Sequence, residues 1–188
     1  EKDFAPITGI VRINQALLGH TSVPATNVTE LIALAKNKPG ELTYGTAGVG
    51  SAPHMNMVLF ESMSGAKLLP VHYRGAAPAL TDVIAGSAQY IITSPIAAGA
   101  HMNSGRVRAL ATTGAERNPG LPELPTIAET VPGYEITQTW GIVAPAGTPR
   151  EIIDRLNAAY TRAAGDPGVQ ERLAKLGLGI RIRTVAEL

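Results

Sequence analysis

The fold is decided by one stretch of the chain, Thr43-Tyr44-Gly45-Thr46-Ala47-Gly48-Val49-Gly50-Ser51-Ala52-Pro53-His54. A short β-prone segment leads into a glycine-rich loop, and a helical pattern of apolar residues begins at Met55. A strand that feeds such a loop into a helix brings backbone N–H groups and the positive end of the helix dipole together. The glycines allow positive φ and a close approach to a ligand. The stretch therefore predicts an anion site, with a tight β–α turn as the alternative.

Outward from this stretch, residues 26–112 alternate between apolar patterns of period 3.6 and period 2. We expect a helix that begins at 26–30, helices at 55–63, 78–85 and 96–102, and strands at 42–44, 67–72, 88–93 and 107–112. This alternation predicts an α/β fold with a doubly wound, mainly parallel sheet. Ligands bind such sheets beyond the carboxyl ends of the strands. The loops at 45–51, 73–75 and 94–95 should therefore share one rim of the sheet.

The flanking segments have a different character. An extended run at 7–18 breaks near Asn14, and a Pro-rich connector at 118–125 marks a crossing between two lobes. We further expect a short helix capped by Thr126 and a strand at 135–143 with Trp140 in a core or lobe interface. A helix at 149–164 should be capped by Thr148 and should bury Ile152, Ile153, Leu156 and Tyr160. A helix from Asp166, a strand at 180–182 and a helix from Val185 capped by Thr184 should follow.

Composition excludes several classes of function. The chain has 188 residues with a net charge of +1, 4% aromatic residues and no cysteine. Scattered Lys and Arg residues and few aromatics argue against nucleic-acid binding. Without cysteine there is no disulfide, thiol catalysis or zinc–thiolate site. No apolar run approaches the length of a membrane span.

The motifs give no catalytic residues, metal site or cofactor site. The glycine-rich loop lacks the Lys of a P-loop, and Pro53 stands where a dinucleotide-binding loop needs its third glycine. Ser51 and His54 lack both a nucleophile elbow and a nearby acid, so we expect His54 to pack against its own loop. The four histidines show no metal-ligand spacing. Reversible capture of an anion fits better than turnover, and we expect no enzyme.

Two further loops leave alternatives open. Tyr73 and Arg74, before Gly75, could offer a phenol and a guanidinium to a carboxylate, or Arg74 could simply be solvated. Ser94 could contact a ligand or cap the helix that follows it.

The chain resembles the solute receptors of tripartite tricarboxylate transporters, the Bug-type proteins. The resemblance runs nearly end to end and is carried by the blocks Glu30–Lys36 with Pro39-Gly40, Tyr44–Ser51 with His54, Val71–Gly75, Leu124–Glu129, Trp140-Gly141 and Ala144–Pro149. The family commonly has Leu at the position of Met55 and Lys at that of Arg74, and neither change removes a donor.

The resemblance implies a periplasmic, non-enzymatic receptor with the type II periplasmic-binding-protein fold. Its two α/β lobes would close on a small carboxylate and deliver it to the permease subunits of a membrane transporter. Carried over residue by residue, the binding set would be Thr46, Ala47, Gly48, Gly50, Ser51, His54, Tyr73, Arg74, Gly75 and Ser94. The alternative from another class is an enzyme or regulator that binds a phosphorylated metabolite in the glycine-rich loop.

The resemblance also implies a domain division. Residues 1–21 would end the first lobe and cross over, residues 22–112 would form the complete second lobe, and residues 113–188 would return to the first lobe. Family members carry a further stretch before the position of Glu1, with the signal peptide and the first-lobe ligand loop. We therefore expect a partial first lobe whose exposed sheet edges favour pairing with another copy.

Overall fold

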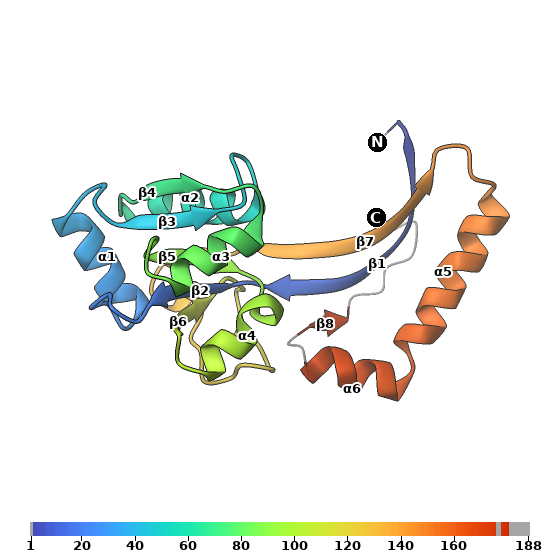
Figure 1. The fold of residues 1–188 in the computed structure, drawn as a ribbon. Coiled ribbons are helices and arrows are strands. Elements are labelled where there is room, and N and C mark those ends of the chain that lie inside the picture. The colour runs from blue at the N-terminus through green and yellow to red at the C-terminus, as the bar shows by residue number, and fades with distance from the viewer. Residues whose placement is uncertain (1, 176–177, 181–188) are drawn as a thin grey trace. The chain divides into compact units, whose positions relative to one another are not determined.

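The computed structural model describes residues 2–175 and 178–180, and the chain divides into two compact units (Figure 1). One unit is residues 14–137, and the other combines residues 1–13 with residues 138–188. The 14–137 unit thus extends beyond the lobe predicted at 22–112. The physical reason is that residues before 22 supply an inner strand of its sheet, while Ile127 and Tyr134 belong to its core.

A five-stranded sheet with the order β4-β3-β5-β2-β6 lies in the middle of the 14–137 unit. Its strands are β2 (Ala16–His20), β3 (Thr43–Thr46), β4 (Leu69–His72), β5 (Tyr90–Thr93) and β6 (Val107–Thr112). β3 runs parallel to β4 and β5, as predicted. β2 runs antiparallel to both of its neighbours, β5 and β6. The four strands other than β2 therefore point the same way, and a helix follows each of β3, β4 and β5.

Helices cover both faces of this sheet. They are α1 (Val28–Asn37), α2 (Ala52–Ser64), α3 (Ala76–Ile84) and α4 (Pro95–Asn103). On one face α1, α2 and residues 127–134 pack against alternate strand residues such as Leu17 and Tyr90. On the other, α3 and α4 pack against the intervening residues, such as Leu18 and Ile91. The period-2 alternation of the strands thus produces two apolar cores in one α/β/α unit.

The predicted helices of this unit are all present, with shifted boundaries. α1 begins within the predicted range, after Asn27, whose side chain caps the helix by accepting from the N–H of Glu30 at 2.9 Å. α2 begins at Ala52 rather than at 55, because Ser51 has the extended backbone of an N-cap and Pro53 fits the first turn. The longer helix places more of its N-terminal turn beside the glycine-rich loop.

Backbone and side-chain hydrogen bonds of Thr113 connect it to residues at both ends of the 14–137 unit. Its hydroxyl accepts from the backbone N–H of Gln15 at 2.9 Å, and its own N–H donates to the Gln15 carbonyl at 2.9 Å. Its carbonyl accepts from the N–H of Ile136 at 3.0 Å. The chain therefore enters and leaves this unit at one place.

The second unit contains a three-stranded sheet with the order β7-β1-β8. Its elements are β1 (Phe4–Asn14), β7 (Thr137–Pro145), β8 (Gly179–Ile180), α5 (Arg150–Ala164) and α6 (Pro167–Lys175). The break predicted near Asn14 is confirmed, because β1 ends there and β2 begins at Ala16. A small core joins Ile7, Ala144 and Ile153. The predicted helix from Val185 and its cap lie outside the described residues.

Three details of this unit differ from expectation. Thr148 does not cap α5, because its hydroxyl donates to the Pro145 carbonyl at 2.8 Å and Pro149 takes the N-cap position. The buried face of α5 is narrower than predicted, since Ile152 and Leu156 are exposed while Ile153 is buried. Trp140 is 47% exposed and so lies outside the core of its unit.

The short helix η1 (Ile127–Glu129) begins with a capping box at Thr126. The Thr126 hydroxyl accepts from the N–H of Glu129, and the Glu129 carboxylate accepts from the N–H of Thr126. The same carboxylate pairs with the Arg117 guanidinium at 2.7 and 2.8 Å. The hydrogen bonds from Arg117, followed by the one from Thr126, lower the pKa of Glu129 to about 2.

We expect this carboxylate to make the 14–137 unit sensitive to acid. Because the pKa of Glu129 is lowered in the folded chain from 4.5 to about 2, its stabilising effect is present above pH 4.5 and is lost as the pH falls toward 2. Glu129→Gln should flatten the dependence of the urea midpoint on pH within that window. The same series with Glu123→Gln, an exposed carboxylate nearby, is the control. Equal slopes for wild type and Glu129→Gln would contradict the assignment.

Candidate anion-binding site

Three loops of the 14–137 unit meet at one rim of its sheet. β4, β3 and β5 are adjacent and parallel, so their carboxyl ends lie at the same edge. α2 follows β3, α3 follows β4, and α4 follows β5 (Figure 1). The prediction that these loops share a rim is confirmed. Three helix N-termini therefore contribute partial positive charge to the same edge.

The loop from β3 to α2 is held by its own side chains. The Thr46 hydroxyl is buried, accepts from the N–H of Gly48 at 3.2 Å and lies 2.7 Å from Nδ1 of His72. The Ser51 hydroxyl donates to the Gly48 carbonyl at 2.7 Å. Both hydroxyls thus have partners within the loop. Their contact with a ligand stays a prediction, and the structure gives them a role in fixing the loop's shape.

The first turn of α2 offers backbone donors at the rim. Ser51 occupies the N-cap position but makes no side-chain hydrogen bond to the helix. Pro53 has no N–H, and the N–H of Met55 donates to the Ser51 carbonyl at 2.9 Å. The N–H groups of Ala52 and His54 belong to the turn in which a helix supplies no carbonyl partner. These two N–H groups can donate to an anion, and so can the N–H of Ala47 in the adjoining loop.

Two glycines of this loop need the conformation that only glycine adopts readily. Gly48 has φ of 117° and Gly50 has φ of 76°. Gly45 is needed for space, because an added Cβ would lie 3.3 Å from the Cβ of Ala79 in α3. Positive φ therefore requires glycine at Gly48 and Gly50, whereas lack of space requires it at Gly45.

In the loop after β4, the Tyr73 hydroxyl already has a protein partner, and its contact with a ligand stays a prediction. The Tyr73 hydroxyl donates to Asp82 of α3 at 2.8 Å. Burial and this hydrogen bond raise the pKa of Tyr73 to about 12. Arg74 is exposed, and Gly75 has φ of 129° at the N-cap of α3, which has no side-chain cap. Arg74 is thus the side chain of this loop that is open to an anion.

Ser94 caps α4. Its side chain accepts from the N–H of Ile96 at 3.3 Å. The cap alternative is therefore confirmed for this residue, and its contact with a ligand stays a prediction.

The histidines near the loop do not form a nucleophile pair with Ser51. Nδ1 of His54 accepts from the N–H of Gly50 at 3.1 Å, so the expectation that His54 packs against its own loop is confirmed. Its ring meets that of His72 edge to face, with centroids 5.1 Å apart. No local sequence pattern connects His72 with this loop. The parallel register that puts Thr46 opposite His72 was the missing information.

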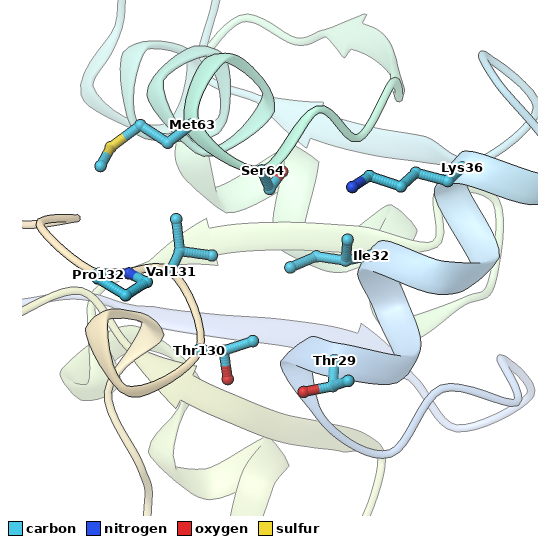
Figure 2. Close-up of a pocket in the computed structure, with 8 residues that line it drawn as sticks. All are labelled: Thr29, Ile32, Lys36, Met63, Ser64, Thr130, Val131 and Pro132. Atoms are coloured by element: carbon cyan, nitrogen blue, oxygen red, sulfur yellow. The ribbon is translucent and has the colours of Figure 1, made fainter.

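A separate pocket of about 350 Å³ lies between α1, the end of α2 and the residues after η1 (Figure 2). Figure 2 shows Ile32 and Val131 in its middle, with Lys36 and Thr29 at different sides. Met63, Ser64, Thr130 and Pro132 complete the lining. This pocket was not predicted. It lies at the C-terminal end of α2, so it is not part of the rim.

Among the described residues we searched for groups that could hold a metal ion and for helices that could span a membrane. Across residues 2–175 and 178–180, His, Asp and Glu side chains form no group of three that could hold a metal ion. Within the same ranges, every helix is too short or too polar to cross a bilayer.

Comparison with known proteins gives consistent relatives. The family model for the tripartite tricarboxylate transporter family receptor matches residues 1–184. A UPF0065 protein in the tcbD-tcbE intergenic region of Pseudomonas sp. (strain P51) is 36% identical over 180 residues, which are 95% of this chain and 54% of that protein. Protein BugT of Bordetella pertussis is 29% identical over 177 residues, 94% of this chain and 54% of that protein.

Solved structures agree. R. palustris Rpa4515 with adipate superposes with a TM-score of 0.94 at 36% identity, covering 98% of this chain and 62% of that chain. MatC from Rhodopseudomonas palustris with bound malate gives a TM-score of 0.84 at 28% identity, covering 93% and 60%. The periplasmic binding protein BugD gives 0.85 at 30% identity, covering 98% and 61%.

The chain spans 54% of the two curated relatives and about three fifths of the solved chains. Within that span the match runs from the first residue to residue 184. The fold expected from the sequence, an α/β fold of the periplasmic-binding-protein type, is therefore confirmed. The chain belongs to the tripartite tricarboxylate transporter receptor family.

Proposed function

We propose that the chain is part of an extracytoplasmic receptor that binds a small organic anion through a carboxylate and delivers it to a membrane permease. The observation that carries this proposal is the rim of the 14–137 unit, where α2 begins without a side-chain cap beside a glycine-rich loop. Membership of the receptor family and relatives solved with adipate and with malate support it.

Binding rests on backbone donors and dipoles more than on side-chain charge. The carboxylate accepts from the N–H groups of Ala52 and His54, and the field of three helix N-termini stabilises its charge. Arg74 adds a cation from the neighbouring loop. Because such an arrangement recognises one carboxylate group, the rest of the ligand is selected elsewhere.

The periplasm is the proposed location, by analogy with BugD, which is a periplasmic binding protein. A receptor role also needs no chemical step, and neither Ser51 nor His54 is arranged as a nucleophile or base. The permease is the proposed partner. Pairing of two copies through the other unit stays a prediction.

We expect adipate and malate to shift the backbone amide NMR signals of residues 47–54 in a saturable manner. NMR titration is the suitable measurement, because it detects weak binding and locates it. The pocket beside Lys36 is the internal control, and its amides should not move first. Ribose phosphate and inorganic phosphate are titrated in parallel. Binding of the phosphates alone would contradict the carboxylate receptor and favour the phosphometabolite alternative.

A further inference from the structure

His54 and the loop it contacts form a small hydrogen-bonded unit. The ring lies in the first turn of α2 and is half-buried. Its Nδ1 is 3.1 Å from the backbone nitrogen of Gly50, four residues earlier. A backbone N–H is always a donor, so Nδ1 must be the acceptor in this contact. The contact therefore requires that Nδ1 carries no proton.

The contact holds the part of the loop where the backbone has positive φ. Gly50 has φ of 76°, and the loop returns from it into the first turn of α2. No carbonyl of a regular helix or strand faces this N–H, since Gly50 lies outside both β3 and α2. The imidazole of His54 thus serves as the acceptor for the Gly50 N–H, in place of the backbone carbonyl that a helix or a sheet would supply.

The neighbouring histidine behaves differently. Nδ1 of His72 lies 2.7 Å from the Thr46 hydroxyl, which also accepts from the N–H of Gly48. A hydroxyl both donates and accepts, so this contact survives in either protonation state of His72 by rotation of one O–H bond. His54 has no such freedom, because its partner is a backbone N–H.

We propose that His54 is a positioning residue for the anion site: neutral His54 holds Gly50, and protonation of its Nδ1 releases the β3–α2 loop and weakens anion binding. The consequence for affinity rests on the function proposed above, whereas the release of Gly50 does not. A proton on Nδ1 would point a donor at a donor, and the hydrogen bond would be lost. Anion capture is then favoured at neutral pH and reduced in acid.

The charged groups around this ring do not replace the lost bond. From β4 the ring faces His72, at 5.1 Å between centroids. From the loop after β4 come Tyr73, which is bonded to Asp82 of α3, and the exposed Arg74. On α2 itself, the Glu61 carboxylate lies two turns away and accepts from the N–H of Leu68 at 2.7 Å. From the glycine-rich loop the ring faces uncharged residues.

The decisive variant is His54→Asn, with His54→Leu as its pair. The Asn side-chain oxygen stands near the position of Nδ1 and accepts without titrating, whereas Leu removes the acceptor.

The ligand-free protein is measured first, by the hydrogen-exchange protection of the Gly50 amide relative to its intrinsic exchange rate. Between about pH 8 and about pH 5.5, where imidazoles take up a proton, the wild type should lose protection about fivefold, the effect expected of one net hydrogen bond. His54→Asn should keep it, and His54→Leu should lack it throughout. Unchanged wild-type protection, or an equal loss in His54→Asn, would overturn the proposal.

Anion binding is measured second, by NMR titration with malate. Malate itself gains protons toward the acid end, and this lowers the affinity of every variant equally. The measured quantity is therefore the ratio of wild-type to His54→Asn affinity, which should fall about fivefold on acidification. His72→Asn should leave the pH dependence in place. A ratio that rises in acid would mean that the imidazolium binds the anion directly and would overturn the proposal. If no variant binds malate while Gly50 protection follows the pattern above, the function proposed for this rim fails, and the release of Gly50 on protonation of His54 stands.

Discussion

Phe60→Ala is expected to lower the free energy of unfolding of the 14–137 unit by about 3–5 kcal/mol, the usual cost of removing a buried aromatic side chain. Phe60 is fully buried in the core formed by α1, α2 and residues 127–134. Its ring packs edge to face against Tyr134, with centroids 6.4 Å apart. The substitution thus removes both apolar burial and an aromatic pair at the place where α2 meets the return segment.

Met63→Ala is the matched control, one turn later on the same helix. Met63 is 39% exposed, so its loss should cost well under about 1 kcal/mol. Urea unfolding followed by far-UV circular dichroism is the measurement. Tryptophan fluorescence is unsuitable for this unit, because the single tryptophan, Trp140, belongs to the other one. Similar costs for the two variants would contradict the position of Phe60 in the core.

Gly48→Val is expected to weaken anion binding by roughly 10- to 100-fold. Gly48 has φ of 117°, a region that residues with a side chain occupy only at a cost of about 1–3 kcal/mol. The Cβ itself has room, since it would lie 3.7 Å from the Tyr73 carbonyl, and the obstacle is the backbone conformation. The loop must relax to a different φ, and the carbonyl of Gly48 then moves away from the Ser51 hydroxyl. The measurement is the malate affinity by NMR titration.

Gly99→Ala provides the control, in the middle of a helix that begins at the same rim. Gly99 lies in α4 with nothing within 4 Å of an added Cβ. Alanine there should favour the helix by up to about 1 kcal/mol and leave malate affinity unchanged. Wild-type affinity in Gly48→Val would show that the shape of this loop does not control binding.

Local patterns were enough to predict most elements of the 14–137 unit. Tyr90, Ile91 and Ile92 form a continuous apolar run, the local signal of a strand buried on both faces, and this signal belongs to β5 alone. The cap at Asn27 likewise depends on neighbouring residues. The site's location at a rim follows from the order of strands and helices, which the same patterns supply.

The features that were missed depend on distant partners. β2 lies between β5 and β6, and no property of Ala16–His20 indicates that both neighbours run antiparallel to it. The Tyr73 hydroxyl bonds to Asp82 only because β4 and α3 bring them together. The exposure of Ile152 and Leu156 depends on what packs against α5. Sequence periodicity gives the faces of an element, and it does not say which neighbour covers each face.

The chain enters and leaves the 14–137 unit beside Thr113, and this has a consequence for folding during synthesis. Residues 14–137 form a continuous segment, so this unit has all its core residues and its closing hydrogen bond once Ile136 has been made. β1 is synthesised before this unit, yet its partner β7 begins only at Thr137. At roughly 5–20 residues per second, β1 waits on the order of ten seconds for that partner. A nascent chain therefore carries a complete 14–137 unit before β1 can pair with β7, and until then the edge of β1 that faces β7 lacks that partner strand.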